Sequence, residues 1–183
     1  MGHVLILGGS GMLSGVALQL LADGHLVAVV GRSRGPLQRM VVRAGAAADR
    51  LVTLRLDYYD IPRLRGWIAH EQLMQGPIET VIAWVTPPAD EVLQAVAAEV
   101  NEYQAAVGWT LLHVLGSRAA REHQDPVLTG PCRYRTVTLG FIREGTGVRW
   151  LSNQEIAQGV YLALAATGPY IVGQVEPWQE RPQ

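Results

Sequence analysis

The residues whose types and spacing point most directly to chemistry form a glycine-rich turn near the start of the chain. A short apolar run, residues 4–7, leads into glycines and then into an apolar segment with helical period. This order predicts a buried strand, a tight turn and a helix. Such a turn directs backbone N–H groups and the positive end of the helix dipole at one point, where a phosphate can bind. We therefore expect a dinucleotide to contact Gly8, Gly9, Ser10, Gly11, Met12 and Leu13.

The basic residues limit the available chemistry, because all fifteen are arginine. Any mechanism that needs a lysine ammonium group is excluded. Genome-wide compositional drift explains why the surface carries arginine and no lysine, but mechanisms that need a lysine remain excluded.

The bulk composition excludes several classes of protein. A formal net charge of −1 argues against a nucleic-acid-binding surface. The single cysteine, Cys132, cannot form a disulfide within one chain and fits a reducing compartment. The chain enters its first strand without a charged leader, and no apolar run is long enough to span a bilayer. We expect one soluble, cytoplasmic domain over residues 1–183, with neither nucleic-acid nor membrane partners.

Strand-like and helix-like segments alternate along the chain, which is typical of a parallel sheet covered on both faces. The spacing predicts an α/β, doubly wound, mainly parallel seven-stranded sheet in the order 3-2-1-4-5-6-7. Strands are expected at residues 4–7, 26–30, 51–56, 78–85, 109–115, 133–142 and 170–175. Helices are expected from residue 13, at 36–47, from a cap at Asp60 to 75, at 88–107, and from a capping box at residues 152–155 to 166. Residues 117–132 show no clear period, which favours a functional or mobile loop.

The order of elements and the glycine turn resemble a Rossmann domain of the short-chain dehydrogenase/reductase superfamily, over nearly the whole chain. In the family's G-x-x-G-x-x-G variant, Gly8 and Gly11 match, and the third position is Ser14, one residue before Gly15. The resemblance implies an NAD(P) cofactor.

Two residues at the end of the second strand bear on the choice of cofactor. An acidic residue there would bind the ribose 2′-hydroxyl of NAD, whereas an arginine offers a charged fork to the 2′-phosphate of NADP. Arg32, with Ser33, therefore favours NADP(H) over NAD(H). A solvated surface arginine is the alternative.

Further cofactor contacts are expected at the ends of the third and fourth strands. The resemblance implies that Asp57 binds the adenine amino group, although an aspartate of a turn or helix cap is an equal alternative. Thr86 follows the fourth strand, near the expected nicotinamide ribose. Tyr58 and Trp84 could stack on cofactor rings, with core packing as the alternative for both.

The family's usual catalytic residues are not all present. A serine after the fifth strand matches Ser117, but the Tyr-x-x-x-Lys pair cannot exist without lysine. The segment between Ser117 and the sixth strand is also too short for the helix that should carry this pair, so the catalytic residues stay unassigned. Tyr134 and His113 are expected to be packed strand residues. No spacing of ligands predicts a metal site. Arg118 and Arg121 either meet an anionic substrate or a cofactor phosphate, or lie in a solvated loop.

Three hypotheses remain open. The first is an oxidoreductase that uses NADP(H) on a small carbonyl or alcohol substrate without Tyr/Lys catalysis. The second is a non-catalytic NADP(H)-binding sensor or regulatory module. The third is a structural domain that binds no nucleotide. The sequence does not identify the substrate, and a homodimer is the default expectation for the oligomeric state.

Overall fold

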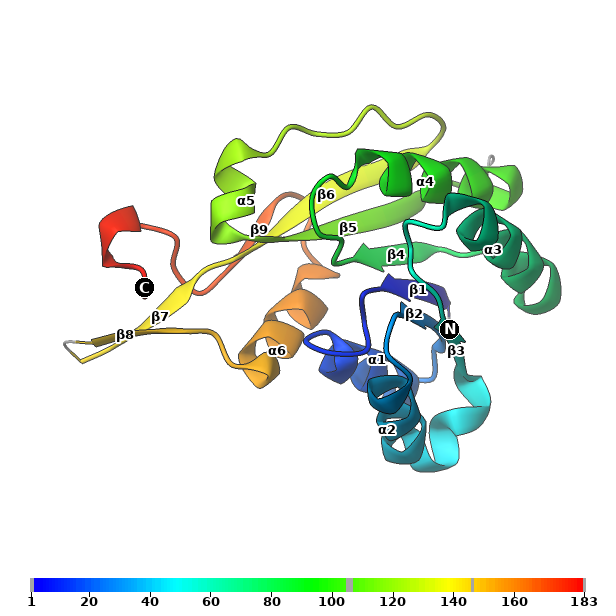
Figure 1. Ribbon diagram of the computed structural model, residues 1–183, viewed down its shortest axis with the longest axis horizontal. Helices are drawn as coiled ribbons and strands as arrows, with labels where there is room; N and C mark the ends of the chain where they lie inside the picture. Colours follow the sequence, from blue (N-terminus) through cyan, green and yellow to red (C-terminus); the bar gives the residue numbers. More distant parts are fainter. Residues whose placement is uncertain (1, 105–106, 146, 183) are drawn as a thin grey trace.

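Seven parallel strands form the central sheet of the computed structural model, which describes residues 2–104, 107–145 and 147–182 (Figure 1). Their order is β3-β2-β1-β4-β5-β6-β9, and every neighbouring pair is parallel. The predicted fold class and strand order are therefore confirmed. The strands are β1 His3–Leu7, β2 Leu26–Gly31, β3 Leu51–Arg55, β4 Thr80–Ala83, β5 Trp109–Gly116, β6 Cys132–Leu139 and β9 Tyr170–Val172.

Helices cover both faces of the sheet, as the alternating pattern predicts (Figure 1). One face packs against α1 (Ser14–Ala22), α2 (Arg34–Ala44) and α6 (Asn153–Ala163). The other face packs against α3 (Ile61–Gln75) and α4 (Asp90–Gln104). Each strand sends alternate apolar side chains into the two cores, because successive residues of a strand point to opposite faces. No helix of the described residues has the length and apolar character needed to cross a membrane.

Two predicted helix starts are confirmed by their caps. Asp60 accepts a hydrogen bond from the Arg63 amide (3.4 Å) at the start of α3. At the start of α6, the Glu155 amide donates to the Ser152 hydroxyl (3.3 Å) and the Ser152 amide donates to the Glu155 carboxylate (2.8 Å). These caps satisfy N–H groups that the first turn of a helix otherwise leaves without a partner.

The strand register brings the expected site residues to one edge of the sheet. Leu7 pairs with Val30 on one side and with Ala83 on the other, so these strands end together. The loops that follow β1 to β5 therefore open at the same edge, which we call the carboxyl rim. Ligands of open α/β sheets bind at this edge.

The structure corrects the prediction in the last third of the chain. A continuous strand over 133–142 is wrong, since β6 ends at Leu139 and an antiparallel hairpin follows, β7 (Phe141–Glu144) and β8 (Gly147–Trp150). Gly140 permits the break, because a Cβ there would lie 2.0 Å from the Gln174 carbonyl oxygen. Within 117–132 the chain forms a six-residue helix, α5 (Ser117–Glu122).

Three helix boundaries also differ from the predicted ones. The helix expected at 36–47 is α2 followed by a 3₁₀ turn, η1 (Gly45–Arg50). The helix expected at 88–107 is described to Gln104, and residues 105 and 106 lie outside the described residues. The last predicted helix ends at Ala163 rather than 166. A second 3₁₀ turn, η2 (Trp178–Glu180), lies near the end of the chain.

Candidate functional site

The glycine turn begins at a position that only glycine can occupy without strain. Gly8 has φ +73°, and a Cβ there would lie 2.3 Å from the Trp84 carbonyl oxygen. Its amide donates to the Val30 carbonyl (3.0 Å), which fixes the turn above β2. Gly8 therefore brings the loops after β1 and β4 into contact.

Gly11 has no comparable structural reason to be glycine. Its φ is not positive, the residue is exposed, and no described atom lies within 4 Å of the position of a Cβ. A side chain would fit the protein there but would fill the space over the turn. Glycine at such a position is typical of a backbone that a ligand approaches closely.

The turn ends at the N-terminus of α1, which is open. Leu13 occupies the cap position with its side chain fully buried, and Met12 packs partly against the same core. No described side chain caps the N–H groups of the first turn. These N–H groups and the helix dipole together favour an anion at this point.

Gly15, one residue after the third position of the glycine pattern, packs against a helix. A Cβ on Gly15 would lie 2.6 Å from the Ala157 Cβ of α6, so this glycine permits close packing of two helices. Ser14, the residue in register with the pattern, is partly exposed and begins α1.

Arg32 and Ser33 lie beside the turn at the end of β2, as predicted. Both are exposed, and the Arg32 guanidinium carbon is 5.8 Å from the centre of the Tyr58 ring. Ser33 occupies the cap position of α2, yet its hydroxyl makes no capping hydrogen bond in the described structure. The side chain of Ser10 lies over Gly31, with its Oγ 2.6 Å from where a Cβ would be. The structure thus brings together Ser10, Arg32 and Ser33.

The loop after β3 is tied to the loop after β4 by two tyrosines. Tyr58 is only 4% exposed and packs in the α3–α4 core, with its hydroxyl 3.4 Å from the Thr86 Oγ1. Tyr59 is 41% exposed, and its hydroxyl donates to the Thr86 carbonyl. The Asp57 carboxylate accepts from the Tyr59 amide (3.2 Å) and so holds this turn. Sequence reasoning missed Tyr59, whose only signal was its place directly after Tyr58 and two residues after Asp57.

A cavity of about 380 Å³ lies where the loop after β4 and the end of β5 meet α5. Trp84 and Thr86 line it, together with the charged side chains of Arg118 and Glu122. The rest of its lining is apolar or backbone: Val85, Pro87, Val114, Leu115, Gly116 and Ala119. Ser117 is buried and is not among the lining residues. Glu122 was missed because the segment after Ser117 lacks a helical period.

Tyr134 joins the buried His113 to His123 in a partly buried cluster. Its hydroxyl is 2.8 Å from the His113 Nδ1 and 2.7 Å from the His123 Nε2. Burial, and then the nearby His123, lower the pKa of His113 to about 4, so this ring is neutral at pH 7. Burial raises the pKa of Tyr134. Neither His113 nor Tyr134 lines the cavity, which agrees with packed strand residues.

The other reactive groups do not form a site. Burial raises the pKa of the Cys132 thiol to about 11, so it is protonated and a weak nucleophile at pH 7. Among the residues that the structure describes, no three histidine, cysteine or acidic side chains are grouped to hold a metal.

Comparisons with known proteins identify the fold. No protein-family model matches the chain, and no curated protein matches its sequence. A short chain dehydrogenase from Bacillus anthracis is similar in structure, with a TM-score of 0.75 at 14% identity over 99% of this chain and 98% of that one. A short-chain type dehydrogenase/reductase from Mycobacterium marinum has a TM-score of 0.72 at 16% identity over 96% and 95%. An alcohol dehydrogenase from the archaeon Thermococcus sibiricus, solved with 5-hydroxy-NADP, has a TM-score of 0.69 at 15% identity over 100% and 99%. The chain therefore has the Rossmann fold of the short-chain dehydrogenases/reductases.

Proposed function

We propose that the protein binds NADP(H) at the carboxyl rim and acts as an oxidoreductase on a small carbonyl or alcohol substrate. Gly11 carries this proposal, because nothing in the described protein requires glycine there and a bound pyrophosphate would. Gly8, Gly9 and Ser10, with the open N-terminus of α1, would hold the pyrophosphate.

The preference for NADP(H) over NAD(H) rests on Arg32 and Ser33. Both side chains are exposed beside Ser10, and Arg32 forms no ion pair within the described chain. A 2′-phosphate at this position would gain a charge-assisted hydrogen bond of roughly 1.5–3 kcal/mol. We therefore expect NADPH to bind at least ten times more tightly than NADH.

The cavity beside Trp84 is the proposed place for the nicotinamide ring and the substrate. Its volume of about 380 Å³ suits a ring and a small molecule, and its apolar lining favours both. Arg118 could hold the oxygen of a carbonyl substrate, while position and orientation contribute most of the rate.

Titration with NADPH and NADH, followed by cofactor fluorescence, tests the binding proposal. We expect micromolar binding of NADPH, much weaker binding of NADH, and loss of the difference in Arg32→Asp. If neither cofactor binds, the domain uses the Rossmann fold as a scaffold only, which is the structural hypothesis.

A non-catalytic NADP(H)-binding sensor or regulatory module is the second candidate. The position of Ser117 favours it, since this serine is buried outside the cavity. Oxidation of NADPH at 340 nm with a panel of aldehydes and ketones separates the two functions. Turnover supports the enzyme, and tight binding without turnover supports the sensor.

We also propose a homodimer in the cytoplasm. β9 is the outer strand of the sheet, and Ile171 on this strand and Leu162 on α6 are about half exposed. Sedimentation of the wild type and of Ile171→Glu tests this: we expect a dimer that the substitution converts to a monomer.

A further inference from the structure

A polar cavity of about 300 Å³ lies beside the glycine turn, between this turn, α2 and the start of α6. Its polar lining consists of Ser10, Gly11, Ser14, Arg39, Arg43 and Asn153. Three of these residues, Ser14, Arg43 and Asn153, also line a groove of about 470 Å³ between α1 and α6. The cavity and the groove therefore adjoin, and they lie next to the proposed pyrophosphate site.

The charge of this region is positive and is not neutralised by the protein. α2 carries Arg34, Arg39 and Arg43 and no acidic residue. None of the three forms an ion pair within the described residues, and no acidic side chain lines the cavity or the groove. Arg34 also lies in the first turn of α2, where the helix dipole disfavours a cation. A bound anion would offset both unfavourable effects.

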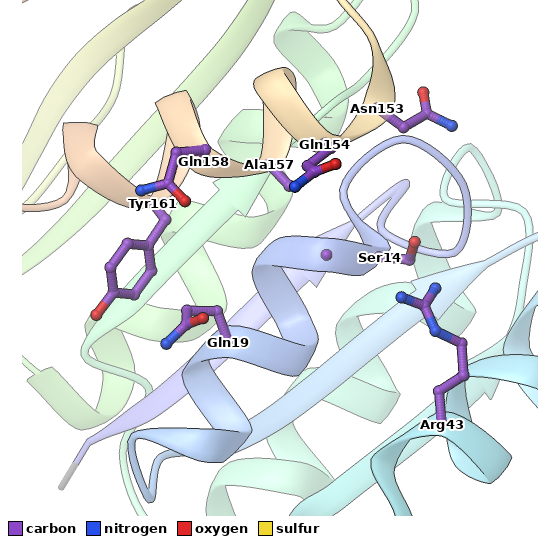
Figure 2. A pocket seen from close by; sticks show the side chains of 9 residues that line it. Ser14, Gln19, Arg43, Asn153, Gln154, Ala157, Gln158 and Tyr161 are labelled. Carbon is purple, nitrogen blue, oxygen red and sulfur yellow. The ribbon is translucent and has the colours of Figure 1, made fainter.

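The donors in this region suit a phosphate. Figure 2 shows Arg43 extending from α2 toward Ser14 at the start of α1, with Gln154 of α6 directed into the same groove. Two guanidinium groups, two serine hydroxyls and the Asn153 amide can donate hydrogen bonds here. A phosphate monoester carries about −1.5 to −2 charges at pH 7, which two guanidinium groups balance; a single carboxylate would leave a positive excess.

We propose that this cavity is a phosphate-monoester site in which Arg39 and Arg43 are the principal ligands. The phosphate has two chemical sources. The first source is the 2′-phosphate of NADP(H); Arg39 and Arg43 then act together with Arg32, and the inference rests on the proposed function. The second source is a separate phosphorylated sugar, whose hydroxyls would meet Gln154 and Gln158 in the groove.

The test compares the double variant Arg39→Gln/Arg43→Gln with the wild type and with Arg133→Gln. Arg133 is a matched control, because it is an exposed arginine at the opposite edge of the sheet and forms no ion pair within the described chain. Thermal unfolding checks that each variant is folded. Binding of NADPH, NADH and ribose 5-phosphate is then measured by calorimetry.

A loss of tenfold or more in NADPH affinity, with NADH unchanged, assigns the cavity to the 2′-phosphate. If the wild type binds ribose 5-phosphate and only the double variant loses it, with NADPH unaffected, the site serves a separate sugar phosphate. A double variant that matches Arg133→Gln with all three probes overturns the inference. If the wild type binds neither nucleotide, the proposed function is wrong, but the inference about the cavity is not. Binding of ribose 5-phosphate then tests the cavity by itself.

Discussion

Two arginines beside the glycine turn and two arginines of the β7–β8 hairpin are used in opposite ways. Around the glycine turn, Arg32 and Arg39 are exposed and form no ion pair in the part of the chain that the structure describes. Beyond β5, Arg149 contacts Glu144 (2.6 Å) and Glu155 (2.7 Å), and Arg143 pairs with Glu180. The same residue type therefore stabilises one region and leaves its charge available for a ligand in the other.

The difference follows from how each region is held together. Around the glycine turn, α1 and α2 bury apolar faces against the sheet, so their arginines are not needed for packing. Apart from Phe141, the β7–β8 hairpin and the segment 173–182 bury little, and side-chain contacts connect them to each other and to α5 and α6. Trp178 illustrates this, since its ring lies under Arg121 of α5 (4.5 Å) and Arg181 (3.9 Å).

The largest effect is expected at the glycine turn. Gly11→Val should weaken NADPH binding at least a hundredfold, about 2.7 kcal/mol, because a side chain fills the space over the turn. Its free energy of unfolding should stay within about 0.5 kcal/mol of the wild type, as for other exposed positions. Calorimetry and urea unfolding measure the two quantities.

Gly8→Ala is the matched control for this substitution. Its positive φ and the contact with Trp84 should lower the free energy of unfolding by about 2 kcal/mol or more. A Gly11→Val protein that is destabilised like Gly8→Ala would show that Gly11 serves the fold rather than a ligand.

The next effect concerns His113, which is buried on β5. In the unfolded chain His113 takes up a proton near the ordinary histidine pKa of 6.5, whereas the folded ring has a pKa of about 4. The unfolded state therefore binds more protons between these values, and stability should fall as the pH is lowered through this window, by about 2 kcal/mol from pH 7 to pH 5. Urea unfolding at several pH values measures the slope.

His113→Asn isolates this contribution, because burial also lowers the pKa of His3. The variant should lose about 2 kcal/mol of the pH dependence. An unchanged slope would mean that His113 is protonated equally in both states.

A smaller effect is expected for Arg32→Gln. NADPH should bind about tenfold more weakly, while NADH binding and stability stay the same. Equal weakening of both nucleotides would place Arg32 near the pyrophosphate instead of the 2′-phosphate.

The smallest effect is expected for Arg149→Met. The carboxylates of Glu144 and Glu155 lose the Arg149 guanidinium at the protein surface, so the urea midpoint should fall only slightly, with NADPH affinity unchanged. Hydrogen bonds from Arg149, and then from Ser152, lower the pKa of Glu155 to about 2, and hydrogen bonds from Arg149 hold the pKa of Glu144 below its usual value. The stabilisation is therefore present above about pH 4.5 and should be lost as the pH falls toward 2. If Arg149→Met altered the NADPH affinity, Arg149 would serve ligand binding as well as stability, and the two groups of arginines would no longer differ in their use.

Local patterns explain why the first part of the fold was predictable from sequence. β1 and β2 are continuous apolar runs, Asp60 and Ser152 are caps, and the glycine turn lies between a strand and a helix. Each of these signals comes from residues that are close in the sequence.

The rest depends on contacts between distant residues. The break at Gly140 requires the Gln174 backbone, and the tyrosine contact with Thr86 joins the loops after β3 and β4. The cavity at Arg39 and Arg43 combines three elements that are remote in the chain. Packing between segments, rather than local preference, decided these features.

The most direct test of the central claim is to follow backbone amide resonances of the protein while NADP⁺ is added. We predict that the amides of Gly9 to Leu13 and of Ser33 shift first and saturate at micromolar concentrations, because their N–H groups would surround the phosphates of the proposed site. Resonances of the β7–β8 hairpin should stay unchanged. Saturable shifts confined to other parts of the protein, or none at all, would contradict a nucleotide site at the glycine turn.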